Sequence, residues 1–192
     1  MINTVQGTLF RLSQEAQEKG RGLAIQKKVC FVLGDPVFWE DYPGFEIDPL
    51  GELTTLERGI ATFCHDQNQS IELVIGDQSI SLELFRDILR SFFQITEGLR
   101  KLKVGISFSL DFGELAHSLR FDPTESDVRC VIQGSEHAPE MTYFLSKSSL
   151  VGALSDFLLM ILRRAKKAGY LSHEEIEGIV KEIQTCADPG AP

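Results

Sequence analysis

Residues 115–133, LAHSLRFDPTESDVRCVIQ, decide the fold class of this chain. Apolar and polar residues alternate at both ends of this stretch, which is the pattern of a half-buried β-strand. The connection between the two predicted strands, residues 122–126, has room for a turn but not for a crossover helix. Parallel strands need a crossover of about a dozen residues or more, so these two strands must be antiparallel.

The same alternation continues on both sides of this hairpin. Gly76-Asp77 stands between two alternating runs and fits a tight hairpin turn. Strands grouped together, with helices before and after them, predict an α+β fold: a single antiparallel sheet of about five to seven strands packed by amphipathic helices, two of them C-terminal. The further predicted strands cover residues 27–33, 71–75, 80–82, 103–110 and 140–146.

Apolar residues at helical spacing predict five helices, which cover residues 4–19, 54–64, 82–97, 150–165 and 172–183. Thr54 with Glu57, and Ser172 with Glu175, have the spacing of a capping box. Ser81 is the predicted N-cap of the third helix, and Gly98 its end. We expect one domain over residues 1–186, followed by a frayed tail at 187–192.

Composition narrows the function classes. The 192 residues include 28 Asp and Glu but 19 Lys and Arg, a net charge of −9. This balance argues against nucleic-acid binding through a basic surface, because Lys and Arg neutralise phosphates. The four cysteines lack C-x-x-C spacing, which fits a reducing compartment. Residues 1–20 lack the pattern of a signal peptide, and the longest apolar helix is too short for a bilayer, so we expect a cytoplasmic protein without membrane contact.

The charge is concentrated in one region. Residues 29–57 hold seven carboxylates and no Lys or Arg. Within them lies an irregular loop, residues 34–53, that we call the acidic–aromatic segment. Rigid aromatic side chains supply contact area at interfaces, and carboxylates steer a basic partner toward them. The predicted anchors are Phe38, Trp39, Tyr42 and Phe45, and the predicted steering charges are Asp35, Glu40, Asp41, Glu46 and Asp48. In the alternative interpretation, the aromatic side chains cover the open face of the sheet and the acids are solvated.

Catalytic and metal motifs are weak in this sequence. Gly20-x-Gly22 follows a predicted helix instead of a strand, and Asp111-Phe112-Gly113 stands without the rest of the kinase motifs. Cys64-His65-Asp66 places adjacent side chains on different faces, which does not suit one metal ion. We therefore predict no catalytic residue, no metal and no cofactor.

The order of hairpin, helix, antiparallel strands and closing helix resembles the layout of small immunity proteins from bacterial polymorphic-toxin systems. The residues that carry the resemblance are 71–82 with the helix to Gly98, the strand pair 106–121, and Phe144 with the helix at 149–168. Such proteins block a toxin by stoichiometric binding. Acidic cytoplasmic chaperones for secreted effectors have a similar appearance.

The sequence thus predicts a non-enzymatic protein-binding module with a basic protein partner. One alternative is a small-ligand-binding protein or an enzyme of unknown class, with a pocket between the sheet and the helix at 82–97. Convergence of His117 with a carboxylate in that pocket would favour this alternative. A third option is a structural subunit that forms homo-oligomers through its apolar C-terminal helices.

Overall fold

The computed structural model describes residues 28–37, 46–112, 117–133 and 140–188. The predicted helix at 4–19 and the tail beyond residue 188 lie outside these ranges. The strands are β1 (Val29–Pro36), β2 (Gln69–Ile75), β3 (Gln78–Glu83), β4 (Phe108–Phe112), β5 (His117–Pro123), β6 (Asp127–Gln133) and β7 (Met141–Ser146). The helices are α2 (Thr55–Asp66), α3 (Leu89–Lys103), α4 (Lys147–Lys167) and α5 (His173–Ala187), and a π-helical turn, η1 (Leu84–Ile88), runs directly into α3.

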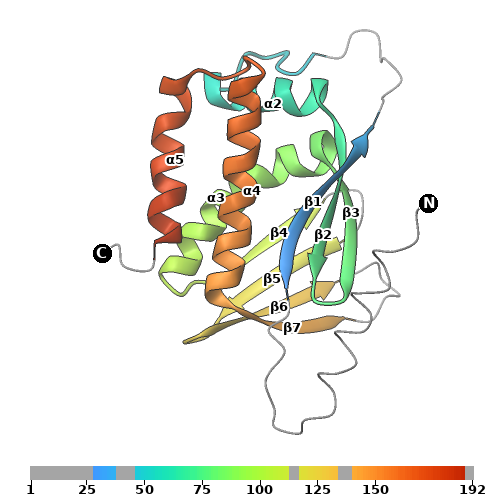
Figure 1. The fold of residues 1–192 in the computed structure, drawn as a ribbon, viewed down its shortest axis with the longest axis vertical. Coiled ribbons are helices and arrows are strands. Elements are labelled where there is room, and N and C mark those ends of the chain that lie inside the picture. The colour runs from blue at the N-terminus through green and yellow to red at the C-terminus, as the bar shows by residue number, and fades with distance from the viewer. Residues whose placement is uncertain (1–27, 38–45, 113–116, 134–139, 189–192) are drawn as a thin grey trace, which may run out of the picture.

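The α+β class and the antiparallel pairing are confirmed, but the prediction of a single sheet is wrong. The strands form a three-stranded sheet of order β1-β2-β3 and a four-stranded sheet of order β4-β5-β6-β7, whose strands cross those of the first at a steep angle (Figure 1). Hairpin-short connections force neighbouring strands to pair, whereas the connection from β3 to β4 contains η1 and α3. That helical connection lets β4 begin a second sheet.

The boundary between α3 and β4 also differs from the prediction. Gly98, expected to end the helix, lies inside α3, where an added Cβ would collide with the ring of Phe108. The helix ends instead at Gly105, whose φ is 76°. The N–H groups of Gly105 and Ile106 donate to the carbonyls of Leu102 and Lys101 at 3.2 and 2.8 Å, which is a Schellman motif. The predicted strand at 103–110 therefore begins only at Phe108.

Ser81 does not cap a helix, which corrects a second local prediction. It lies in β3, and the chain stays extended as far as Glu83. Glu83 is the N-cap of η1 and its side chain makes no capping bond; instead, its N–H donates to Oδ2 of Asp87 at 2.8 Å. Both predicted capping boxes are confirmed, at Thr54 with Glu57 and at Ser172 with Glu175.

One hydrophobic cluster includes core residues of both sheets. α4 lies at its centre and contacts β1, β6, β7 and the other three α-helices of the described part of the chain, with α5 alongside it (Figure 1). The ring of Phe31 in β1 stacks on Phe157 of α4 with 3.9 Å between centroids, and in the four-stranded sheet Phe108 stacks on Phe121 at 4.7 Å. α4 therefore holds together two sheets that share no ladder of hydrogen bonds.

A polar contact also joins the sheets. The hydroxyl of Tyr143 in β7 donates to Oδ1 of Asp77, in the turn between β2 and β3, at 2.8 Å. Burial and the neighbouring Asp77 carboxylate raise the pKa of Tyr143. The phenol thus stays neutral and able to donate at ordinary pH.

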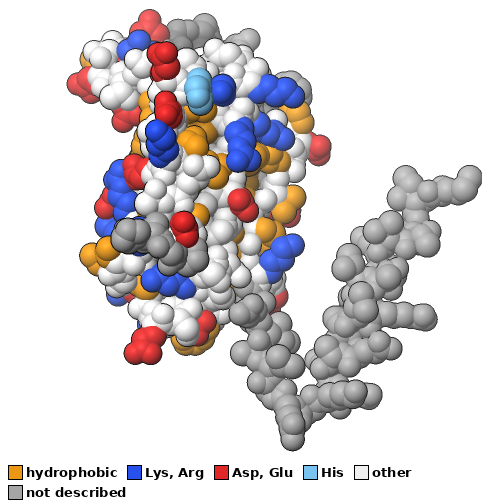
Figure 2. Space-filling model, turned by 60° about the vertical axis from the view of Figure 1, so that its left-hand side comes forward, with side chains coloured by type: hydrophobic (Ala, Val, Ile, Leu, Met, Phe, Trp, Pro, Cys, Tyr) orange, Lys and Arg blue, Asp and Glu red, His pale blue; other side chains and the backbone are white. Residues whose placement is uncertain are grey.

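The helical face carries charges of both signs, with Lys and Arg side chains gathered toward the end at the top of the view (Figure 2). Arg164, Lys166 and Lys167 occupy the last turn of α4, where cations offset the negative end of the helix dipole. Among the helices of the described ranges, none combines the length and the apolar character that crossing a bilayer requires.

Candidate functional site

The acidic–aromatic segment enters and leaves the described structure at two anchored points. At its start, β1 ends in the exposed residues Gly34, Asp35 and Pro36, and the N–H of Val37 donates to the carbonyl of Asn68 at 3.0 Å. At its end, Glu46 is exposed and Asp48 is partly buried. The other predicted site residues lie outside the described residues: Phe38, Trp39, Glu40, Asp41, Tyr42 and Phe45.

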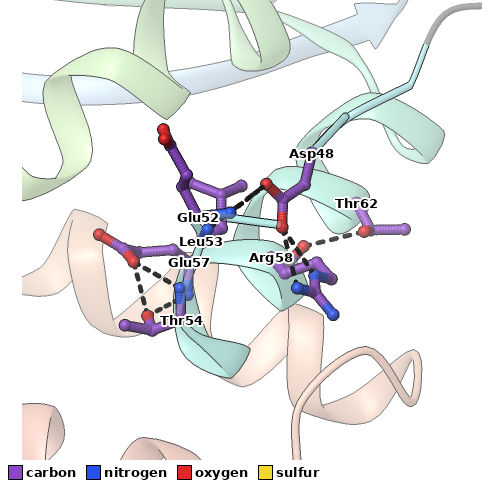
Figure 3. Close-up of polar contacts among 7 residues, drawn as sticks. All are labelled: Asp48, Glu52, Leu53, Thr54, Glu57, Arg58 and Thr62. Atoms are coloured by element: carbon purple, nitrogen blue, oxygen red, sulfur yellow. Dashed lines mark hydrogen bonds and ion pairs between the residues drawn. The ribbon is translucent and has the colours of Figure 1, made fainter. Parts of the chain in front are cut away.

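Asp48 does not present a free charge. Its Oδ1 accepts hydrogen bonds from the N–H groups of Glu52 at 2.9 Å and Leu53 at 3.4 Å, while Nη2 of Arg58 lies 2.9 Å from its Oδ2 (Figure 3). Burial acts to raise the pKa of Asp48, but the hydrogen bonds from Arg58 and the two backbone groups outweigh it and leave the pKa below its usual value. Its carboxylate closes the turn that leads into α2.

The start of α2 is fixed by the capping box beside this turn (Figure 3). The N–H of Thr54 donates to Oε2 of Glu57 at 2.8 Å, and the N–H of Glu57 donates back to Oγ1 of Thr54 at 3.3 Å. The hydrogen bond from the Thr54 hydroxyl has the largest effect on Glu57 and the bond from the Thr54 N–H the next largest. Together they hold the pKa of Glu57 below its usual value. The C-terminal border of the acidic–aromatic segment is therefore part of the ordered fold.

Asp35 and Glu46 differ from Asp48 in this respect. Both side chains are exposed, and neither carboxylate has an ion-pair partner among the described residues. The sequence pattern grouped all three acids together, because the run without Lys or Arg ends one residue before Arg58. Only the structure shows that the Arg58 side chain pairs with Asp48.

A groove of about 730 Å³ lies between β1 and α4, next to this region. One wall consists of residues 28–33, and the other consists of the α4 face that carries Gly152, Ala153 and Asp156. The sequence reasoning missed this groove. The available signal was the pair of small residues, Gly152 and Ala153, between the large apolar residues Leu150 and Leu154.

A smaller hollow of about 340 Å³ lies between α3 and β4, close to the place where the sequence suggested a ligand pocket. Its lining includes Phe93, Glu97 and Lys101. Glu97 is paired with Arg100 at 2.8 Å, so its charge is already compensated. His117 pairs with Phe112 in the sheet, and its side chain lies outside the described part.

The cysteines are free thiols, and Cys64 and Cys130 are buried. Burial raises the pKa of each of these two thiols to about 12, so both stay protonated and unreactive at neutral pH. Nδ1 of His65 lies 2.9 Å from Oδ1 of Asp66, turned away from the buried Cys64. Among the described residues, no group of three or more His, Cys, Asp or Glu side chains could hold a metal ion.

The geometry of this region thus combines anchored loop ends, an adjacent groove, and exposed carboxylates that are unpaired within the described ranges. In comparisons with known proteins, no family model, no curated protein and no solved structure matches this chain.

Proposed function

We propose that this chain is a non-enzymatic protein-binding module that captures a basic protein partner through the acidic–aromatic segment. The observation that carries the proposal is the state of Asp35 and Glu46, which are exposed and have no ion-pair partner among the described residues. Uncompensated carboxylates at both borders of the segment create a local negative potential. Such a potential raises the association rate of a positively charged partner.

The anchored borders support the same proposal. Val37 is held to Asn68 on one side, and Asp48 is held to Arg58 on the other. A binding loop whose ends are fixed loses less conformational entropy when a partner binds. Trp39 and Tyr42 are the proposed anchors, since Trp and Tyr are the residue types enriched at binding hot spots.

The proposed setting is the cytoplasm, where such a module would act by stoichiometric binding, as immunity and chaperone-like proteins do. Free cysteines, two of them buried in the core, are compatible with a reducing compartment. The hollow between α3 and β4 supports the ligand-binding alternative less well, because its acidic side chain is already paired with Arg100.

The test is affinity capture from native lysate with the wild type and the Trp39→Ala/Tyr42→Ala double variant, followed by measurement of the affinity for each captured protein. We expect a basic partner whose affinity falls at least about 30-fold in the double variant, the equivalent of one 2 kcal/mol hot spot. High salt should slow its association.

The matched control is Phe144→Ala, which removes a 63% exposed aromatic side chain from β7, far along the chain from the acidic–aromatic segment. It should leave binding unchanged. The proposal would be contradicted if the amount of captured partner were the same at low and high salt and in the double variant. It would also be contradicted if the folded wild-type protein captured no partner.

A further inference from the structure

The groove between β1 and α4 is bounded by the edge of a strand. Side chains of a strand alternate between its two faces, so a pocket on one face is lined by every second residue. Here the lining includes each residue from Lys28 to Leu33 in succession. Consecutive residues can all border one groove when the backbone edge of the strand faces it.

Within the described part of the chain, that edge is unpaired. β1 pairs with β2 on one side, and no strand of the described structure pairs with its other side. Proteins usually protect such edges with charged residues, prolines or bulges. β1 has these devices only at its ends: Lys28 precedes it, and Pro36 follows a register shift after Leu33. Val29–Leu33 carry no charge, and Val32 is 48% exposed.

The opposite wall has room for a chain. An added Cβ at Gly152 would meet no atom within 4 Å, so this part of α4 faces open space. Phe157, stacked on Phe31, forms the apolar floor. A strand of five residues is about 17 Å long, which matches the unprotected part of β1.

The charged residues near the groove indicate which kind of segment would bind there. Asp156 on the α4 wall is exposed and has no ion-pair partner among the described residues. Asp35 stands beyond the far end of the unprotected edge, where β1 runs into the acidic–aromatic segment. Lys28 lines the groove at the start of β1, so the carboxylate available inside it is Asp156. A basic side chain of an extended segment would meet Asp156, while alternate apolar side chains would enter the groove.

We propose that this groove receives an extended segment of alternating apolar and basic residues, which pairs with the free edge of β1 as an added strand. The inference rests on the proposed function, because it names the part of the basic partner that is recognised. Main-chain hydrogen bonds to β1 supply affinity in this mode, and the groove and Asp156 supply selectivity.

The test uses a fluorescein-labelled peptide of four Val-Lys repeats as the probe and the full chain as the receptor, with anisotropy as the readout. We expect binding that falls at least tenfold when alternate peptide nitrogens are methylated, because methylation removes the donors that a strand needs. A peptide of four Val-Glu repeats should not bind. Amide hydrogen exchange at residues 29–33 should slow when the Val-Lys peptide is present.

Variants of the protein locate the site. Gly152→Leu fills the groove and should weaken binding at least tenfold, whereas Gly178→Leu, at an equally open helical position in α5, should not change it. Asp156→Lys should weaken binding more than Glu125→Lys, an exposed change of the same charge in the turn between β5 and β6.

Absence of Val-Lys binding, equal binding of the methylated peptide, or full binding to Gly152→Leu would overturn the inference. Each of these results leaves the proposed function intact, because that proposal is tested through Trp39 and Tyr42. The opposite result is also distinguishable: the partner could still be captured by the Trp39→Ala/Tyr42→Ala variant while the peptide still binds at β1. That result would overturn the proposal that the acidic–aromatic segment binds the partner, and it would leave the groove as a binding site.

Discussion

The four-stranded sheet and the three-stranded sheet use their apolar residues differently. In the four-stranded sheet, most inward side chains are almost fully buried, as in Leu110, Phe121 and Leu145, and Met141 at the start of β7 is half-buried. In the three-stranded sheet, β2 and β3 are equally buried, but Phe31 and Leu33 of β1 are only half-buried. The four-stranded sheet is therefore the more completely buried of the two, whereas β1 of the three-stranded sheet is only half-covered by the described residues.

The largest expected effect separates the two sheets by stability. Phe121→Ala should lower the free energy of unfolding by about 3–5 kcal/mol, because it removes a buried ring from the four-stranded sheet. Phe31→Ala should cost about 2 kcal/mol, since that ring is half-buried and leaves a cavity open to water. Urea unfolding followed by circular dichroism measures both values. Equal losses would show that β1 is as much a part of the core as β5.

The next prediction concerns two helical glycines. Gly98→Ala should destabilise the protein by about 1–3 kcal/mol, because the new methyl group must displace the ring of Phe108 beside the four-stranded sheet. Gly152→Ala, beside the open groove, should stabilise it by about 0.5–1 kcal/mol through higher helix propensity. Thermal unfolding of both variants shows whether each substitution raises or lowers the stability. A loss of stability in Gly152→Ala would mean that the groove is filled.

The last prediction tests the contact between the sheets, and its expected effect is smaller than the losses for Phe121→Ala and Phe31→Ala. Tyr143→Phe should lower the free energy of unfolding by about 1.5 kcal/mol, the value of a hydrogen bond to a carboxylate. Tyr170→Phe removes a similar bond, from the Tyr170 hydroxyl to Oδ2 of Asp66 at 2.9 Å, but at a more exposed place. It should cost less.

A double-mutant cycle of Tyr143→Phe with Asp77→Asn then isolates the pair. If the two changes add without any coupling, the hydrogen bond between the hairpin turn and β7 does not contribute to joining the sheets.

Local signals in the sequence predicted the local structure well. The hairpin at Gly76-Asp77 and the two capping boxes depend on residues within a few positions of one another, and all three are present. The predicted end of α3 at Gly98 was wrong for a physical reason: the glycine leaves room for the ring of Phe108, ten residues further along the chain. The alternation at 103–110 was misleading as well, since Val104 and Ile106, on either side of Gly105, lie outside any strand and are 68% and 54% exposed.

The candidate site was predictable only in part. Composition identifies the acidic–aromatic segment, but it cannot distinguish Asp35, which has no ion-pair partner among the described residues, from Asp48, which pairs with Arg58. That distinction depends on how the chain turns at Gly51, where φ is 68°. The groove was not predicted, because it arises between β1 and α4, which are distant in the sequence.

The stacking of Phe31 on Phe157 also bears on how the chain is made. During translation β1 leaves the ribosome well before α4, the helix that packs against it. Contacts between such distant residues form slowly and leave apolar surface exposed in the meantime. The side of β1 that Phe157 covers therefore stays exposed until α4 has been synthesised.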